Sequence, residues 1–193
     1  MAKLKRSDLY SLEKYSEIRS EFRKKIIAHK ENRRVLLGEH LLLLFEDQLI
    51  MQYQVQEMLK AEKIFEAAGI EEELDAYNPL IPDGSNWKAT MMIQYEDLDE
   101  RKKMLGELIG IEDKVYMQVE GFDKVFAIAD EDISRDNADK TSAVHFLRFE
   151  LDADMAAAAK QGISIDAGVE HDKYSYTVKL AENVRSSLVK DLD

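Results

Sequence analysis

In the N-terminal third of the chain, hydrophobic residues recur every three or four positions, as in helices with one buried face. This pattern predicts a first helix that begins after the N-cap residue Ser7 and ends near Gly38. A second helix is expected from the N-cap residue Asp47 to Gly69. Between the two helices, the apolar run at residues 41–46 predicts a buried strand.

From Trp87 onward, hydrophobic and polar residues alternate, which is the period of a half-buried β-strand. Strands are predicted at residues 87–95, 114–120, 122–129, 141–151, 163–170 and 174–180. Helices are predicted at residues 97–109, 152–161 and 181–192. Two pairs of neighbouring strands are expected to form hairpins, one around Gly121 and one around residues 171–173.

Two other segments have the composition of loops. Residues 77–84 contain both prolines of the chain and predict a stiff extended loop that closes in a turn. Residues 130–140 are polar and acidic, which also predicts a loop. Because adjacent strands occur in runs between helices, we expect a single α+β domain over residues 1–193, with a mixed, largely antiparallel sheet packed against several helices.

Composition narrows the class of protein. A chain of 193 residues with 45% hydrophobic and 34% charged residues resembles an ordinary globular domain. No apolar run approaches the ~18–20 residues of a membrane span, and no signal peptide is visible, so we expect a cytoplasmic protein, a monomer or a small homo-oligomer. The absence of cysteine excludes thiolate catalysis, cysteine-ligated zinc and iron–sulfur ligation by this chain.

The net charge of −12 is unevenly distributed. Residues 1–34 contain 11 Lys and Arg against 5 Asp and Glu, so the rest of the chain is strongly acidic. An acidic body argues against binding of nucleic acid. We expect the basic segment to stabilise this acidic body or a partner, and binding of an anion or nucleic acid is the weaker alternative.

The second predicted helix carries polar residues within its apolar arc. Gln54 and Glu57 lie in the middle of this arc, and Tyr53 lies beside Glu57. An unpaired buried carboxylate costs several kcal/mol, so Glu57 must be paired, protonated or bound to a ligand.

His145 lies on the apolar face of the strand predicted at residues 141–151, and Glu57 is its expected partner. Such a pair is either a structural hydrogen bond or a general acid/base or metal site. His171, at the tip of a hairpin, is a further candidate ligand. Arg148 and Glu150 share the opposite face of the strand and are expected to pair with each other.

Several catalytic and cofactor motifs are absent. The chain contains no G-x-G-x-x-G or Walker A loop, no H-E-x-x-H and no G-x-S-x-G. No histidine follows a glutamate by three residues, which excludes a di-iron bundle built on Glu-x-x-His. Catalytic residues and cofactors therefore remain unassigned.

Several ordered strings along the whole chain resemble the bacterial domain-of-unknown-function family 3501. The strings are Asp8-Leu9, Arg33-Arg34, Gln56-Glu57-Met58-Leu59, Tyr77-Asn78-Pro79-Leu80-Ile81-Pro82-Asp83-Gly84 and Ser142-Ala143-Val144-His145-Phe146-Leu147-Arg148-Phe149. The resemblance carries no established activity. It implies, through association with rubrerythrin-like proteins and a cysteine-rich iron–sulfur oxidoreductase, a redox or oxidative-stress setting.

Three hypotheses follow. The first is a non-enzymatic accessory protein that docks on an iron- or redox-handling partner through an exposed face or residues 77–84. The second is a small enzyme or a metal- or ligand-binding protein with a pocket around Glu57 and His145. The third is an anion- or nucleic-acid-binding module that uses the basic first helix.

Overall fold

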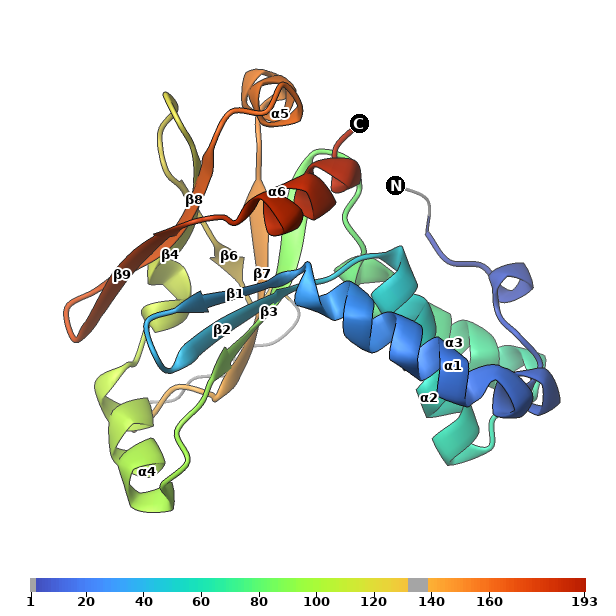
Figure 1. Cartoon of the computed structure of the whole chain (residues 1–193). Helices are drawn as coiled ribbons and strands as arrows, with labels where there is room; N and C mark the ends of the chain where they lie inside the picture. The colour runs from blue at the N-terminus through green and yellow to red at the C-terminus, as the bar shows by residue number, and fades with distance from the viewer. Residues whose placement is uncertain (1–2, 132–138) are drawn as a thin grey trace.

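The computed structural model describes residues 3–131 and 139–193 of the chain (Figure 1). Its helices are α1 (Leu12–Glu31), α2 (Gln48–Glu62), α3 (Ala67–Tyr77), α4 (Leu98–Glu107), α5 (Ala153–Lys160) and α6 (Glu182–Leu188). Its strands are β1 (Arg34–Leu37), β2 (Leu41–Phe45), β3 (Asn86–Ile93), β4 (Val115–Val119), β5 (Val125–Phe126), β6 (Ile128–Ala129), β7 (Val144–Glu150), β8 (Ile165–His171) and β9 (Tyr174–Lys179). Short 3-10 helices occupy Arg6–Asp8, Asn78–Leu80, Ile111–Lys114 and Val189–Asp191.

The strands form two antiparallel sheets, which confirms the α+β class. One sheet has the order β1-β2-β3-β7-β6, and the other has the order β5-β4-β8-β9. Apolar side chains from both sheets pack into the main hydrophobic core, which includes Phe45, Trp87, Phe149, Met117 and Val169. The strands thus divide between two sheets that share one core, where the sequence predicted one sheet.

Strand register sorts the side chains of the first sheet onto two faces. Met91 is opposite His145 and Ala89 is opposite Leu147, and all four are buried on the face toward the main core. Thr90, opposite Phe146, therefore points to the other face, because successive side chains of a strand alternate. This outer face is where the candidate site described below is formed.

Helices α1, α2 and α3 pack side by side and project away from the strands (Figure 1). They have their own apolar clusters. One contains Met51, Val55 and Leu59 of α2 with Leu74 of α3, and another is centred on Phe22 of α1. Among the described residues, no helix is long and apolar enough to cross a membrane.

The first helix ends earlier than the sequence predicted. It stops at Glu31, because the residues of β1 pair with β2, with Leu37 opposite Leu41. Gly38 has a φ of +66° and makes the hairpin turn between these strands, not the end of a helix. Strand pairing, a tertiary interaction, overrides the local helical pattern here.

The second helix was also predicted too long. It ends at Glu62, because Lys63 adopts a left-handed conformation with a φ of 55° and its N–H bonds to the Leu59 carbonyl. The chain then begins α3 at Ala67, so Gly69 lies inside α3. The residues that the sequence placed in the last turns of the second helix therefore belong to a separate helix.

The structure confirms some of the predicted loops and hairpins and differs from others. Residues 77–84 are not extended throughout, because Asn78–Leu80 forms a turn of 3-10 helix. Of the loop predicted at 130–140, residues 132–138 lie outside the described part of the chain. The hairpin of β8 and β9 is confirmed, whereas the strand predicted at 122–129 is divided between β5, which pairs with β4, and β6, which pairs with β7.

Candidate functional site

Glu57 is paired across the α1–α2 interface. Arg19 donates to both carboxylate oxygens at 2.7 Å, and the Tyr15 hydroxyl donates to Oε1 at 2.5 Å. The hydrogen bond from Arg19 is the main reason that the pKa of Glu57 lies below its usual value. The Glu57 carboxylate is therefore paired, as expected for a partly buried charge, but its partners are on α1 and do not include His145.

His145 is fully buried in the main core. Its Nδ1 lies 2.6 Å from Asp130 Oδ2, and its Nε2 lies 2.8 Å from Thr141 Oγ1 and 3.1 Å from the Ser142 carbonyl oxygen. Asp130 has a φ of 48°, and its Oδ1 also accepts from the Phe146 N–H. The carboxylate of Asp130 thereby holds both the histidine ring and the backbone of β7.

The predicted contact between Glu57 and His145 is wrong. Strand register directs His145 toward the second sheet, whereas Glu57 faces α1 in the projecting helices. The strand pattern correctly placed His145 in the interior, whereas 28% of the Glu57 side chain is exposed and the buried face of α2 includes Met51, Val55 and Leu59.

The other three candidates are not gathered into one site either. Tyr53 packs edge to face with Phe22 of α1, with 5.9 Å between the ring centroids. Gln54 is half-buried on α2, and His171 accepts a hydrogen bond from the Lys173 N–H in the β8–β9 turn. Within residues 3–131 and 139–193, no three or more His, Cys, Asp or Glu side chains are arranged to hold a metal ion. A ligand-binding role for these residues stays a prediction.

Arg33 forms a buried ionic cluster where β1 follows α1. Its guanidinium donates to the carboxylate of Asp191, to the Phe45 carbonyl at 2.9 Å and to the Glu46 carbonyl at 3.0 Å. Asp47 Oδ2 lies 3.5 Å from Arg33 Nη1. Burial raises the pKa of Asp191 to about 6, although Arg33 opposes this shift. The cluster ties the C-terminal 3-10 helix to β2.

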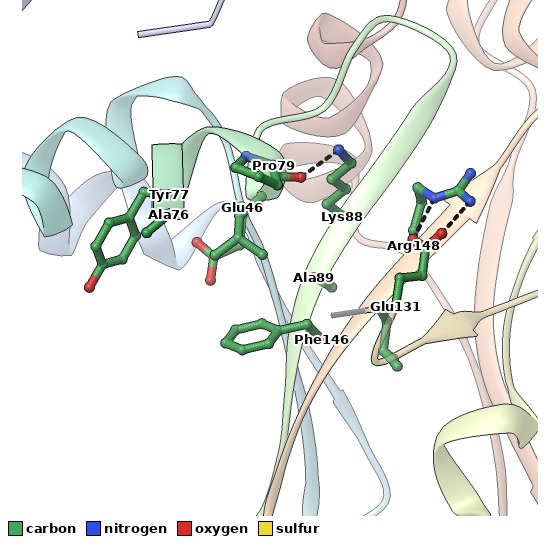
Figure 2. A pocket seen from close by; sticks show the side chains of 11 residues that line it. Glu46, Ala76, Tyr77, Pro79, Lys88, Ala89, Glu131, Phe146 and Arg148 are labelled. Atoms are coloured by element: carbon green, nitrogen blue, oxygen red, sulfur yellow. Dashed lines mark hydrogen bonds and ion pairs between the residues drawn. The ribbon is translucent and has the colours of Figure 1, made fainter. Parts of the chain in front are cut away.

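A cavity of about 330 Å³ lies on the outer face of the first sheet (Figure 2). The C-terminal end of α3 and the following 3-10 helix form one wall, and β3 and β7 form the other. The lining residues are Glu46, Ala76, Tyr77, Pro79, Leu80, Lys88, Ala89, Glu131, Phe146, Leu147 and Arg148. Most of the lining residues are apolar, and the ionisable ones are Lys88 of β3, Arg148 of β7, and Glu46 and Glu131, which lie just beyond β2 and β6.

Glu46 is the most unusual group in the lining. It directly follows β2 and is 2% exposed. Its Oε1 accepts from the Thr90 hydroxyl at 2.6 Å, but its Oε2 is buried and has no hydrogen-bond partner among the described residues. Burial raises the pKa of Glu46 despite the opposing effects of Thr90 and of the Lys30 and Arg33 charges. In Figure 2 the carboxyl group points toward the space between Tyr77 and Phe146.

The two cations of the lining already have partners. Arg148 donates from Nε and Nη2 to both oxygens of Glu131, each at 2.8 Å, and from Nη1 to Glu150. The bond to Glu150 confirms the pairing predicted from the strand pattern. Lys88 donates to the Pro79 carbonyl at 2.6 Å, and burial lowers its pKa.

Sequence reasoning missed this cavity. Glu46 was visible only as the polar end of an apolar run, directly before the N-cap Asp47. The alternation in β7 did place Phe146 and Arg148 on one face, but nothing in the sequence indicated that Tyr77 would lie across from them. An ionisable residue that ends a buried strand is the signal that could have drawn attention to Glu46.

Comparison with known proteins identifies a family. The sequence profile of the family described as "Protein of unknown function (DUF3501)" matches residues 3–192, so the chain belongs to this family. The chain is also similar to a solved structure from Burkholderia pseudomallei K96243, described as a novel protein of unknown function. The two are 49% identical, with a TM-score of 0.93 and 100% of each chain covered. No curated protein matches the chain.

Proposed function

We propose that this member of the DUF3501 family binds a small, mostly apolar molecule in the cavity beside Glu46. The observation that carries the proposal is that Glu46, a residue of the cavity wall, has a buried carboxyl oxygen, Oε2, without a hydrogen-bond partner among the described residues. A buried carboxyl oxygen without a hydrogen bond is unfavourable. A ligand that donates a hydrogen bond to Oε2 would remove this cost.

The dimensions and lining of the cavity support the same function. Its volume of about 330 Å³ lies at the small end of the range for ligand pockets, which is roughly 300–1,000 Å³. Such pockets are mainly apolar and contain a few polar groups that orient the ligand. Here Tyr77, Pro79, Leu80 and Phe146 supply the apolar surface. The polar groups are Glu46, Lys88, Glu131 and Arg148.

A variant that closes the mouth of the cavity tests the proposal. Ala76 is an exposed residue of α3 that lines the cavity, so Ala76→Trp is expected to fill it without disturbing the core. Ala68→Trp is the matched control, because Ala68 is an exposed residue of the same helix outside the lining. A fragment library is screened against the full chain by ligand-observed NMR.

We expect some fragments to bind the wild type and Ala68→Trp equally and to lose binding to Ala76→Trp. A screen without any binder, or binders that Ala76→Trp does not weaken, would overturn the proposal. Circular dichroism of both variants verifies that each is folded to the same extent.

The redox or oxidative-stress setting rests on the resemblance alone and stays a separate prediction. In that reading the chain is an accessory protein for a rubrerythrin-like protein or an iron–sulfur oxidoreductase in the cytoplasm. Capture of such a partner from the native cell, and elemental analysis of protein purified without chelators, would test it. Loss of partner binding in Ala76→Trp would link this role to the cavity.

A further inference from the structure

Among the described residues, one hydrogen-bond acceptor of the cavity lining, Glu46 Oε2, has no donor, whereas each cation of the lining has an acceptor. Its two cations are engaged, Arg148 by Glu131 and Glu150, and Lys88 by the Pro79 carbonyl. The unmet bond belongs to Glu46 Oε2, which can only accept when the carboxyl group is ionised. A ligand that completes the cavity must therefore bring a donor.

In the described part of the chain, neither Lys88 nor Arg148 forms a hydrogen bond or ion pair with the Glu46 carboxyl group. Lys88 lies opposite Glu46 on the neighbouring strand, and the Glu46 N–H bonds to the Lys88 carbonyl at 2.8 Å. The Lys88 side chain nevertheless turns toward Pro79, away from the Glu46 carboxyl group (Figure 2). The negative charge of an ionised Glu46 is thus available for a positive group of the ligand.

Aromatic rings stand near the same carboxyl group. Tyr77 and Phe146 lie on either side of the space toward which Glu46 points (Figure 2). Aromatic faces attract ammonium groups through their quadrupole, and their apolar surface accommodates hydrocarbon. A cationic head on an apolar body matches both features.

We propose that the ligand is a small primary amine whose ammonium group donates to Glu46 Oε2 and whose apolar body packs between Tyr77 and Phe146. This inference rests on the proposed function, that the cavity binds a small molecule. An anionic ligand fits less well, because it would have to displace Glu131 or Glu150 from Arg148. It would also face the negative charge of Glu46.

Probes that share one apolar body and differ in the head group test the ligand class. Phenethylamine, phenethyl alcohol and hydrocinnamate carry an ammonium, a hydroxyl and a carboxylate group, and isoamylamine with isoamyl alcohol repeats the comparison on an aliphatic body. Affinities for the full chain are measured at neutral pH by NMR titration. We expect at least one amine to bind about tenfold more tightly than its alcohol, as for a hydrogen bond to a charged group.

The Glu46→Gln variant tests whether Glu46 causes the preference for the amine over the alcohol. It is expected to weaken amine binding about tenfold while alcohol binding changes less than about twofold, because the amide keeps the size of the side chain and removes the charge. If the variant folds poorly, the test uses the wild type instead. The measured quantity is then the change in the NMR chemical shift of the Glu46 carboxyl carbon when the amine is added.

Equal binding of amine and alcohol, or tightest binding of hydrocinnamate, would overturn the amine assignment while the cavity remains a binding site. Failure of the proposed function would give a different result from failure of the amine assignment. In that case, Ala76→Trp would abolish binding of neither the probes nor any fragment.

Discussion

The Arg33 cluster and the cavity are adjacent, because Glu46 belongs to both, but they differ in how their buried charged groups are paired. On one side, Arg33 binds the Glu46 carbonyl and faces the carboxylates of Asp191 and Asp47. On the other side, Glu46 Oε2 has no partner among the described residues. Breaking a buried ion pair is strongly destabilising, so the Arg33 cluster fixes the chain, whereas the unpartnered oxygen of Glu46 carries a cost that a ligand could remove. The difference identifies the cavity as the region where function is to be sought.

The largest effect should follow from removal of the cation in the cluster. Arg33→Met leaves Asp191 buried without its partner, which is expected to lower the free energy of unfolding by about 3–5 kcal/mol. Urea denaturation at neutral pH measures the loss. Arg34→Met is the control, because Arg34 is exposed and pairs only with Glu31 in the described structure, so its removal should change little. A loss no larger than that of the control would contradict the structural role of the cluster.

The pH dependence of Asp191 gives the next effect. Its folded-state pKa of about 6 lies above the ordinary value of 3.8, so the protonated form is favoured in the folded protein. The resulting stability is complete below the unfolded-state pKa and is lost as the pH rises through about 6.

Compared with Asp191→Asn, the wild type should therefore gain about 1–3 kcal/mol of unfolding free energy when the pH falls from neutral to about 4. Denaturation of both proteins across this range measures the gain. Asp172→Asn, at an exposed hairpin position, should show no such divergence from the wild type. A difference that stays constant with pH would show that Asp191 remains ionised.

A smaller effect is expected at Glu57, which is paired but partly exposed. Glu57→Gln weakens the bonds from Tyr15 and Arg19 and should cost about 1 kcal/mol at neutral pH. Because the pKa of Glu57 is lowered, its contribution is present above the ordinary glutamate pKa and is lost as the pH falls through the folded-state value. The deficit of the variant should thus vanish in acid, whereas exposed Glu62→Gln should show no deficit at any pH. A loss as large as that of Arg33→Met would mean that the α1–α2 interface depends on this ion pair.

The smallest change in stability, and of opposite sign, is expected at Glu46. Its raised pKa means that ionisation opposes folding, so Glu46→Gln should raise the unfolding free energy at neutral pH by up to about 1 kcal/mol. The gain should disappear as the pH falls and the wild-type carboxyl group becomes protonated. Chemical denaturation at neutral and acidic pH checks both points. A clear destabilisation would show that the ionised carboxylate is paired and structural, which would break the contrast with the Arg33 cluster.

Several local elements of this protein can be predicted from the amino-acid sequence alone. Asp47 caps α2, as its position before a helical pattern indicated, and α4 and α5 lie within the ranges 97–109 and 152–161 predicted for helices. The β8–β9 hairpin also followed from the alternation of residues along the chain. These features depend on interactions within a few residues, namely helix capping and side-chain periodicity, so a single sequence contains them.

Which polar groups contact one another depends on the tertiary fold. Glu57 bonds to Arg19 rather than to His145, and Glu46 shares a cavity with Tyr77 and Phe146, which come from distant parts of the chain. Periodicity shows that a side chain is buried, but strand order and register determine what lies opposite it. A shift of one residue in register would turn Phe146 toward the core and His145 toward the cavity, because side chains alternate between the faces of a sheet. The candidate site is therefore a property of strand pairing and helix packing, both of which join residues far apart in sequence.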